Sequence, residues 1–355
     1  MKVLYFTKYT RLGASSRLRC YQYFPYLEKS GIEVHVSPLF CDQYLIDLYA
    51  KKKVSKLGVL KAYFKRFFKL FQVFSYDKIV IDDELFPYFP AWFEVFFSKL
   101  GVQYMSDYDD AVFHNYNLHS SALLRFFLGN KIATVMKNSC CVLAGNAYLA
   151  DYAKKSGAKN VEIFPTVVDV DRYQAKSDFN LDKNTTLNLG WIGSASTQKY
   201  MVKIIPVLEK IAKEHSLKLY LIGTSNEISS TLDIVYLPWS EATEAENLQK
   251  IDVGFMPLDN SPWEQGKCGY KLIQYMASGI PVIASDVGVN AEIVKERKNG
   301  FLATEEIDWQ NAIYTYLENR ELLPVFGKEG RKIVVEKYNL ALTSKLLINR
   351  LNGII

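Results

Sequence analysis

Short, continuously apolar segments alternate along the chain with longer segments in which apolar residues recur at helical spacing. Strands that are buried on both faces have this continuous apolar character, and their alternation with helices is typical of a parallel sheet with right-handed crossovers. The pattern predicts helices at 200–214 and 269–278. It predicts strands at 2–6, 78–83, 141–145, 187–193, 217–223, 252–258 and 281–285. We therefore expect an α/β protein.

The pattern restarts near residue 186, after a polar, weakly periodic segment at 169–186. A chain of 355 residues is also too long for one ordinary core. We expect two doubly wound, Rossmann-like domains that face each other across a central cleft, with ligands at the carboxyl ends of the strands. The predicted ranges are 1–180 for the first domain, 181–335 for the second domain, and 336–355 for a final helix.

Several classes of protein are disfavoured by composition. The five cysteines are scattered without a CxxC pair, so neither a zinc site nor a disulfide framework is expected. The first residues resemble a strand rather than a signal peptide, and no apolar stretch is long enough to span a bilayer. We expect a cytoplasmic protein. Residues 1–180 hold 24 Lys and Arg against 17 Asp and Glu, and such basic surfaces attract phosphorylated or lipid anions.

Two loops that follow predicted strands have features of phosphate-binding turns. In the first, Gly13 permits close backbone approach, and Arg17 adds a charge suited to phosphate. In the second, Gly193 and Ser194 begin a turn into a helix that carries Lys199. Neither loop has the GxGxxG pattern of a dinucleotide-dependent dehydrogenase. Ordinary turns capped by serine or threonine, with solvated cations, remain the alternative.

The longest candidate element is the loop and helix that begin at residue 266. Lys267, Cys268 and Gly269 form a loop with free backbone amides, and Lys271 lies at the start of the following helix. A cation is normally unfavourable there because of the helix dipole, so a bound diphosphate would explain it. Glu264 is placed to accept hydrogen bonds from sugar hydroxyls, and Gln274 follows Lys271 on the same helix face.

Residues 188–294 resemble the donor-binding domain of retaining glycosyltransferases of the GT-B fold, family 4. The resemblance rests on the order of the motifs WIGS, LIGTS, PW and GKCGYKLIQYMASGIPVIAS. It extends over most of the chain, through GASSRLR, DELFP, DYDDAVF, GNAYLADYA and PTVVD.

The resemblance implies a GT-B fold and transfer of a sugar from a nucleotide diphosphate to a hydroxyl, with retention and without metal or other cofactor. It implies that residues 1–180 form an acceptor-binding domain, that residues 181–335 form a nucleotide-sugar-binding domain, and that the final helix at 336–355 crosses back to the first domain. It implies that Lys271 is the main counter-charge of the diphosphate, and that Gly13 and Arg17 close over the phosphates. It implies further donor contacts from Gly193, Ser194, Lys199, Leu237, Trp239, Lys267, Cys268 and Gly269.

The chain departs from the family at one pair of positions. Many members carry a Glu-x7-Glu pair, whereas an ungapped alignment places Gly266 and Gln274 there. Gln274 can still bind a ribose hydroxyl, and Glu264 can replace the first glutamate if the loop is two residues longer. A catalytically altered or non-catalytic nucleotide-sugar-binding relative, or a GT-B epimerase, therefore stays open as an alternative.

Asp109 and Asp110 follow a probable strand that includes residues 102–106, so they are expected at the cleft, where a carboxylate can orient the acceptor hydroxyl. Glu84 is a weaker candidate, and helix capping is the alternative role of the aspartates. In enzymes of this kind the departing phosphate oxygen is expected to take the acceptor proton, so that catalysis consists mainly of positioning and electrostatic stabilisation. The expected acceptor is a glycan or a polyprenyl-diphosphate-linked glycan of bacterial envelope polysaccharide synthesis.

Residues 51–76 combine eight Lys and Arg with aromatic residues at helical spacing. Such a basic helix with an aromatic face suits an anionic membrane surface, which would place the protein at the inner face of the plasma membrane. The alternative is that the aromatic stripe packs on its own sheet. Nucleic acid is not expected, since no stacking-sheet motif accompanies the aromatics.

Overall fold

The computed structural model describes residues 1–50 and 52–353, which form two compact units. Unit 1 contains Met1–Thr166, Gln265–Cys268 and the segment from Leu340, and unit 2 contains Val167–Glu264 and Gly269–Asn339. The residues just after Thr166 group with unit 2, whereas the sequence pattern placed the boundary at residue 180. Their anchors explain this: Val168 bridges to Asn339, and the Tyr173 hydroxyl donates to Glu244.

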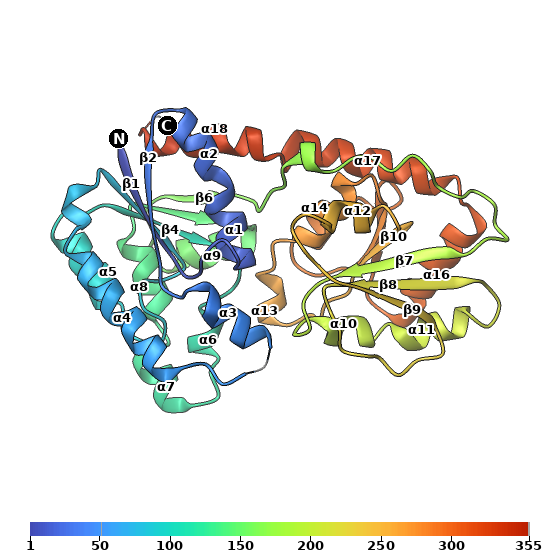
Figure 1. Ribbon diagram of the computed structural model, residues 1–355, viewed down its shortest axis with the longest axis horizontal. Helices are drawn as coiled ribbons and strands as arrows, with labels where there is room; N and C mark the ends of the chain where they lie inside the picture. The colour runs from blue at the N-terminus through green and yellow to red at the C-terminus, as the bar shows by residue number, and fades with distance from the viewer. Residues whose placement is uncertain (51, 354–355) are drawn as a thin grey trace. The chain divides into compact units, whose positions relative to one another are not determined.

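Unit 1 is built on a six-stranded, wholly parallel sheet with the order β2-β1-β3-β4-β5-β6 (Figure 1). Its strands are β1 (Lys2–Thr7), β2 (Glu33–Pro38), β3 (Lys78–Asp82), β4 (Tyr104–Tyr108), β5 (Cys141–Ala144) and β6 (Val161–Ile163). Its helices are α1 (Ala14–Arg19), α2 (Phe24–Lys29), α3 (Asp42–Tyr49), α4 (Lys56–Leu70), α5 (Trp92–Lys99), α6 (His114–Asn117), α7 (Ala122–Leu128), α8 (Lys131–Asn138), α9 (Ala147–Lys155) and α18 (Leu340–Leu351), with 3₁₀ turns at Tyr21–Tyr23 and Val73–Ser75.

Unit 2 is built on a second six-stranded parallel sheet, with the order β12-β11-β10-β7-β8-β9. Its strands are β7 (Leu187–Ile192), β8 (Leu217–Ile222), β9 (Asp233–Leu237), β10 (Val253–Met256), β11 (Val282–Ser285) and β12 (Gly300–Ala303). Its helices are α10 (Gln198–Val202), α11 (Ile205–Ile211), α12 (Glu244–Leu248), α13 (Pro262–Gln265), α14 (Tyr270–Ala277), α15 (Asn290–Ile293), α16 (Glu306–Glu318) and α17 (Leu322–Lys337), with a 3₁₀ turn at Val170–Arg172.

The α/β class and the two Rossmann-like sheets are confirmed, and each of the seven predicted strands is a strand. The predicted helix at 200–214 is divided into α10 and α11, and Pro206 lies in the first turn of α11. The four edge strands β2, β6, β9 and β12 were not predicted. Most residues of β2, β6 and β9 are at least partly exposed, and β12 has only four residues, so none of them has a long continuous apolar run.

The buried Arg66 of α4 joins the carboxyl ends of the strands in unit 1. Its Nη2 donates to the carbonyl oxygens of Thr7 and Ser37 at 2.6 and 2.7 Å, and Nη1 donates to Leu85. Burial lowers the pKa of this guanidinium to about 9. Hydrogen bonds to backbone carbonyls at the ends of β1 and β2 thus fix the edge from which the first loop departs.

Helices α14 and α17 approach each other so closely that a side chain does not fit at Gly327. A Cβ atom added there would lie 1.9 Å from the carbonyl oxygen of Gly279. Gly279 itself has a φ of +70° and follows α14, which ends as the sequence predicted. This contact places α14, and therefore its first residues, against α17.

We expect Gly327→Ala to lower the free energy of unfolding of unit 2 by about 1–3 kcal/mol, because the methyl group must push the two helices apart. Urea denaturation followed by circular dichroism measures this change. Lys328→Ala on the exposed neighbouring position is the matched control and should change the midpoint little. Equal midpoints for the Gly327 variant and the wild type would show that the two helices are not closely packed.

Candidate functional site

Lys271 and Gly193, which are far apart in the sequence, meet at the carboxyl end of β7 in unit 2. The Lys271 Nζ lies 4.6 Å from the centroid of the Trp191 ring. A Cβ atom added at Gly193 would lie 2.9 Å from this Nζ and 2.5 Å from the same ring. The glycine therefore provides the space in which the ammonium group lies, and an indole face stabilises that position.

The first turn of α14 has the features of an anion-binding helix terminus. Gly269 is its N-cap residue, with a φ of +67° and no side-chain capping bond, and its first turn holds no acidic residue. Amide donors at a helix N-terminus are not satisfied within the helix, and the dipole there favours negative charge. Lys271 adds a formal charge to this terminus, as the sequence indicated.

The ends of β8 and β9 lie beside the same turn. The Gly223 amide donates to the Leu237 carbonyl at 2.9 Å, and a Cβ at Gly223 would lie 2.8 Å from the Gly193 carbonyl oxygen. Trp239 follows β9, and its indole Nε1 donates to Glu244 Oε2 at 2.7 Å. Glu244 is buried and was missed from sequence; its only signal is a carboxylate five residues after a tryptophan.

Ser194 and Lys199 are exposed on the segment that follows Gly193. No side chain caps the next helix: Thr197 is the N-cap residue of α10 without a side-chain capping bond, and the Ser196 hydroxyl pairs with that of Ser194 at 2.9 Å. The Lys199 Nζ lies 4.8 Å from the Tyr200 ring. The two seryl hydroxyls and Lys199 therefore lie on the solvent side of this turn.

Glu264 is buried, and both of its carboxylate oxygens already accept hydrogen bonds. The Tyr200 hydroxyl donates to Oε1 and the Ser261 hydroxyl donates to Oε2. Glu264 thus connects α13 to α10, the helix next to the Gly193 turn. This bridge has no signal in the sequence, where Tyr200 belongs to a segment with helical spacing of apolar residues.

Gln274 is also buried, one turn after Lys271 on α14. The Tyr173 hydroxyl and the Trp239 indole both donate to the buried Glu244, so these three side chains form one polar group.

The segment Gln265–Cys268 packs within unit 1. The Lys267 Nζ lies 3.0 Å from both carboxylate oxygens of Asp110, and the Cys268 thiol donates to the Asp109 carbonyl at 2.9 Å. Burial and the neighbouring Asp109 raise the pKa of Asp110 to about 6, although Lys267 acts in the opposite direction. Both predicted aspartates therefore lie beside this segment, and Asp110 already has a cationic partner.

Gly266 explains the departure from the Glu-x7-Glu pattern. A Cβ atom there would lie 2.5 Å from the Cβ of Ala111 and 2.7 Å from its amide nitrogen. Asn146 fixes the backbone of the same segment, since its Nδ2 donates to the Lys267 carbonyl at 3.0 Å. No side chain, and hence no glutamate, fits at position 266 while the segment is packed in this way.

The first loop of unit 1 also differs in detail from the sequence prediction. Gly13 is tightly enclosed, because a Cβ there would lie 2.5 Å from the Tyr9 Cβ. Arg17 is buried, with Nη1 3.5 Å from the Leu12 carbonyl. Ser15 and Ser16 lie inside α1 and do not cap it; their hydroxyls donate to Asp109 at 2.9 Å and to Asp82 at 2.6 Å.

A second group of carboxylates was missed at the end of β3. Asp83 has a φ of +62° and lies 3.6 Å from the Lys8 ammonium, while its Oδ1 is buried with no hydrogen-bond partner among the described residues. Burial raises its pKa well above the usual range. Glu84, the weaker candidate from the sequence, is paired with Lys131 and with the Tyr116 hydroxyl. The overlooked signal was the doubled aspartate at the end of an apolar run.

Asp107 and Arg19 form a buried ion pair with a structural role. The Arg19 Nε donates to Asp107 at 2.8 Å, and Nη1 donates to the Phe164 carbonyl at 2.7 Å. The guanidinium thus joins β4 to the residue that follows β6 and stabilises the edge where Asp109 and Asp110 lie.

Two further features of the described residues, 1–50 and 52–353, bear on chemistry. They hold no group of three or more His, Cys, Asp or Glu side chains arranged to bind a metal ion. None of their helices combines the length and the low charge that crossing a bilayer requires.

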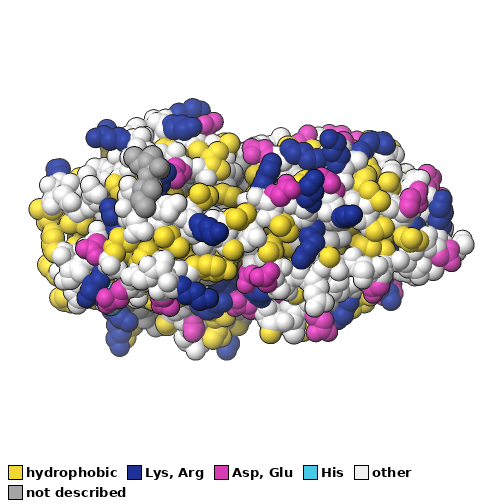
Figure 2. Space-filling view, turned by 90° about the horizontal axis from the view of Figure 1, so that it is seen from above, with side chains coloured by type: hydrophobic (Ala, Val, Ile, Leu, Met, Phe, Trp, Pro, Cys, Tyr) yellow, Lys and Arg dark blue, Asp and Glu magenta, His cyan; other side chains and the backbone are white. Residues whose placement is uncertain are grey.

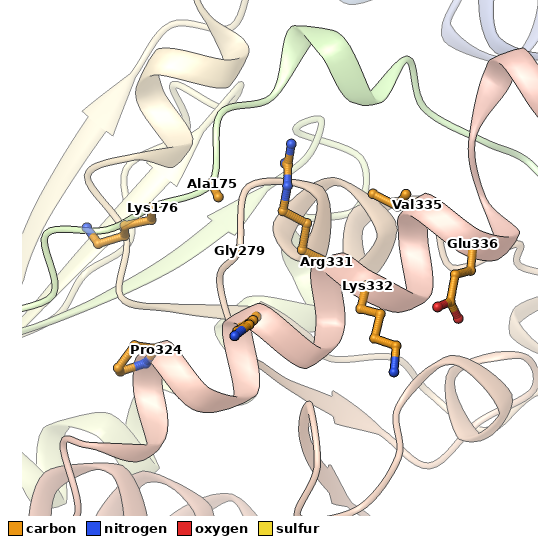
Figure 3. A pocket seen from close by; sticks show the side chains of 9 residues that line it. Ala175, Lys176, Gly279, Pro324, Arg331, Lys332, Val335 and Glu336 are labelled. Carbon is orange, nitrogen blue, oxygen red and sulfur yellow. The ribbon is translucent and has the colours of Figure 1, made fainter.

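A surface pocket of about 470 Å³ lies beside α17 (Figure 3). Lys and Arg side chains gather over this part of unit 2 (Figure 2). Two of the cations that line the pocket already have partners within unit 2. Lys176 donates to the Gln249 carbonyl and pairs with Asp252 at 3.3 Å. Arg331 donates to the Tyr173 carbonyl. The pocket adjoins Gly279, at the end of α14 opposite to Lys271, so it does not belong to the candidate site.

We expect Gly266→Ala to release the segment that carries Cys268, because the new methyl group overlaps Ala111. The measurement uses a background in which Cys41 and Cys140 are replaced by serine. There, Cys268 should react with a thiol reagent at least about tenfold faster, which corresponds to a decrease of roughly 1.4 kcal/mol in the free energy of local opening. Gly58→Ala is the matched control, since its Cβ would meet only Ser55 at 3.3 Å. An unchanged rate in the Gly266 variant would show that the segment is not held as described.

Comparison with known proteins adds two findings. Residues 186–319 match the family model described as "Glycosyl transferases group 1". No curated protein shows significant sequence similarity to the chain. Among solved structures, sucrose-phosphate synthase from Thermosynechococcus elongatus has a TM-score of 0.74 at 15% identity and covers 100% of this chain and 99% of its own.

Two other structures show the same fold. Anabaena Alr3699/HepE in complex with UDP and glucose has a TM-score of 0.70 at 15% identity, covering 99% of this chain and 100% of its own. WaaG, described as a glycosyltransferase involved in lipopolysaccharide biosynthesis, has a TM-score of 0.68 at 12% identity, with coverage of 99% and 100%. The chain therefore has the GT-B fold, and its residues 186–319 match a group 1 glycosyltransferase domain.

Proposed function

We propose that the protein is a glycosyltransferase that moves a sugar from a nucleotide diphosphate to a hydroxyl group, with retention of the anomeric configuration. The observation that carries the proposal is the position of Lys271, in the first turn of α14 and over Gly193, inside the segment that matches the glycosyltransferase model. Neither the helix nor the strand needs a cation there for its own stability, whereas a diphosphate does.

In this proposal the donor diphosphate lies at the N-terminus of α14. Lys271 and the amides after Gly269 neutralise the leaving group, and Lys199 approaches from the solvent side. Leu237 and Trp239 lie beside the base, with Trp239 fixed by Glu244. This set supplies the charge stabilisation that a metal ion provides in other enzymes, so we propose transfer without a metal or other cofactor.

For the donor, UDP-glucose is the compound to test first. HepE was solved with UDP-glucose and with UDP and glucose, which supports a uridine nucleotide without establishing it for this chain. For the acceptor, Asp109 and Asp110 remain the proposed orienting groups. Asp110 is held by Lys267, so an acceptor hydroxyl would meet a carboxylate of fixed direction.

We further propose a glycan or lipid-linked acceptor in envelope polysaccharide synthesis, with the protein on the inner face of the plasma membrane. The exposed apolar side chains of α4 support membrane association through residues 51–76; Lys51 lies outside the described residues. WaaG supports the envelope role by its described part in lipopolysaccharide biosynthesis.

A second candidate is a relative that binds a nucleotide sugar without transferring it. Two residues near the proposed sugar position favour this candidate. Both carboxylate oxygens of Glu264 accept hydrogen bonds within the protein, and Gln274 is buried. Binding with no release of nucleotide diphosphate, tested over a panel of acceptors, would support this candidate over the first.

We expect Lys271→Ala to weaken donor binding at least about tenfold, because the loss of one charge-assisted contact to a phosphate costs roughly 1.5–3 kcal/mol. Calorimetric titration with UDP-sugars, and with UDP alone, measures the change. Lys298→Ala, which removes an exposed cation of the same unit, is the control. If no nucleotide sugar binds the wild type, or if both variants bind as the wild type does, the proposed function fails.

We expect Glu264→Ala and Tyr200→Phe to raise the donor KM by similar factors, because each removes the same contact between α13 and α10. Steady-state rates of nucleotide release measure KM and kcat for both variants. A fall in kcat in the glutamate variant alone would instead place its carboxylate on the sugar.

A further inference from the structure

Helix α4 presents two different apolar faces. Tyr63 and Phe67 pack into the core of unit 1, and Arg66 and Leu70 are buried beside them. The opposite face remains at the surface, with six large side chains that are each more than half exposed: Leu57, Leu60, Phe64, Phe68, Phe71 and, just beyond the helix, Phe74. The aromatic stripe thus packs on its own sheet only in part.

Helix α7 exposes even more apolar surface for its length. Only Leu128 of its seven residues is buried. The exposed fractions of Leu123, Phe126 and Phe127 are 69%, 82% and 67%. The centroids of the two phenylalanine rings lie 5.1 Å apart, edge to face, so the rings form one apolar protrusion. The core of unit 1 gains little from these side chains, and exposing them to water is unfavourable.

The exposed residues of α4 and α5 belong to one continuous surface. Helices α4 and α5 are joined by Phe67 and Phe93, whose ring centroids are 5.8 Å apart. Trp92 and Phe96 of α5 are both more than half exposed. Helix α5 in turn packs on α8, which directly follows α7. Figure 1 shows α4, α5 and α7 together in unit 1, and hydrophobic side chains form much of the surface at the left end of Figure 2.

The helices α4, α5 and α7 expose no acidic side chain. Residues 48–76 and 111–150 contain no Asp or Glu, and the one acidic residue of α5, Glu94, is buried. Cations lie among the exposed apolar side chains: Lys56, Lys61 and Lys65 on α4, and Arg125 on α7. Surfaces that bind other proteins usually have a polar rim of both signs, whereas a surface of cations and aromatic groups alone is complementary to anionic lipid.

We propose that α7 inserts Leu123, Phe126 and Phe127 into the boundary between headgroups and acyl chains of an anionic bilayer, while the outer face of α4 lies flat on the headgroups. Aromatic side chains favour that boundary, and the lysines of α4 reach the lipid phosphates. The inference deepens the proposed membrane association, rests on it, and does not depend on sugar transfer. It names an insertion element that helical spacing in residues 51–76 did not reveal.

Vesicle flotation tests the proposal. We expect the wild type to float with vesicles of phosphatidylcholine and phosphatidylglycerol, and much less with phosphatidylcholine alone or at high salt. Phe126→Glu with Phe127→Glu should lower binding to the anionic vesicles at least about tenfold. Ile307→Glu with Val325→Glu is the matched control; it adds the same charge at two exposed apolar positions of unit 2 and should float as the wild type does.

Insertion itself is measured with Phe126→Trp, whose added fluorescence should be quenched by lipids brominated on their acyl chains, whereas that of Ile307→Trp should not. Circular dichroism and binding of UDP-sugars check that each variant is folded, and they separate failure of the membrane proposal from failure of the proposed function. Three results would overturn the proposal. The wild type does not bind anionic vesicles, the α7 variant binds them as well as the wild type does, or the protein self-associates through this surface in vesicle-free solution.

Discussion

Parallel pairing is the constraint on which the rest of this structure depends. Each of the two sheets is wholly parallel, so all the loops that leave the carboxyl ends of its strands meet at one edge. In unit 2 this brings the Gly193 turn, the Gly223 turn and the start of α14 into contact, although they span about eighty residues of sequence. The glycines at these turns leave space that Lys271 and neighbouring backbone occupy. Residues from several loops therefore surround one charged group, Lys271, which no single loop could do.

The segment Gln265–Cys268 packs beside the carboxylates of unit 1. Its packing excludes a side chain at position 266, places Lys267 on Asp110, and buries the Cys268 thiol against the Asp109 carbonyl. A glutamate at Gly266 and this packing are mutually exclusive, so the departure from the family pattern has a steric cause. The charge that a glutamate would supply is present nearby as Glu264, but its oxygens are bonded to Tyr200 and Ser261.

Periodicity was sufficient for the fold class and for the buried strands, because a strand covered on both faces must be apolar throughout. It failed for the edge strands β2, β6, β9 and β12, which are short or partly exposed. Motif order led to Lys271 and Gly193, but not to their partners. Asp83, Glu244 and Tyr200 owe their positions to contacts between distant segments, and a single sequence carries no signal of such contacts. For the same reason Glu84 looked available while Lys131 and Tyr116 hold it in the core.

Helix α4 shows why a stripe of aromatic residues cannot be assigned from spacing alone. The same fifteen residues bury Arg66 and expose Phe64 and Phe68, which inverts the usual partition of charged and apolar side chains. The buried guanidinium has a structural role, because it donates hydrogen bonds to three backbone carbonyls near the strand ends. The exposed rings have no corresponding structural role within unit 1. A folded chain gains nothing from phenylalanine in water. Contact with something other than solvent therefore explains why these rings, and those of α7, stay at the surface of helices that expose no acidic side chain.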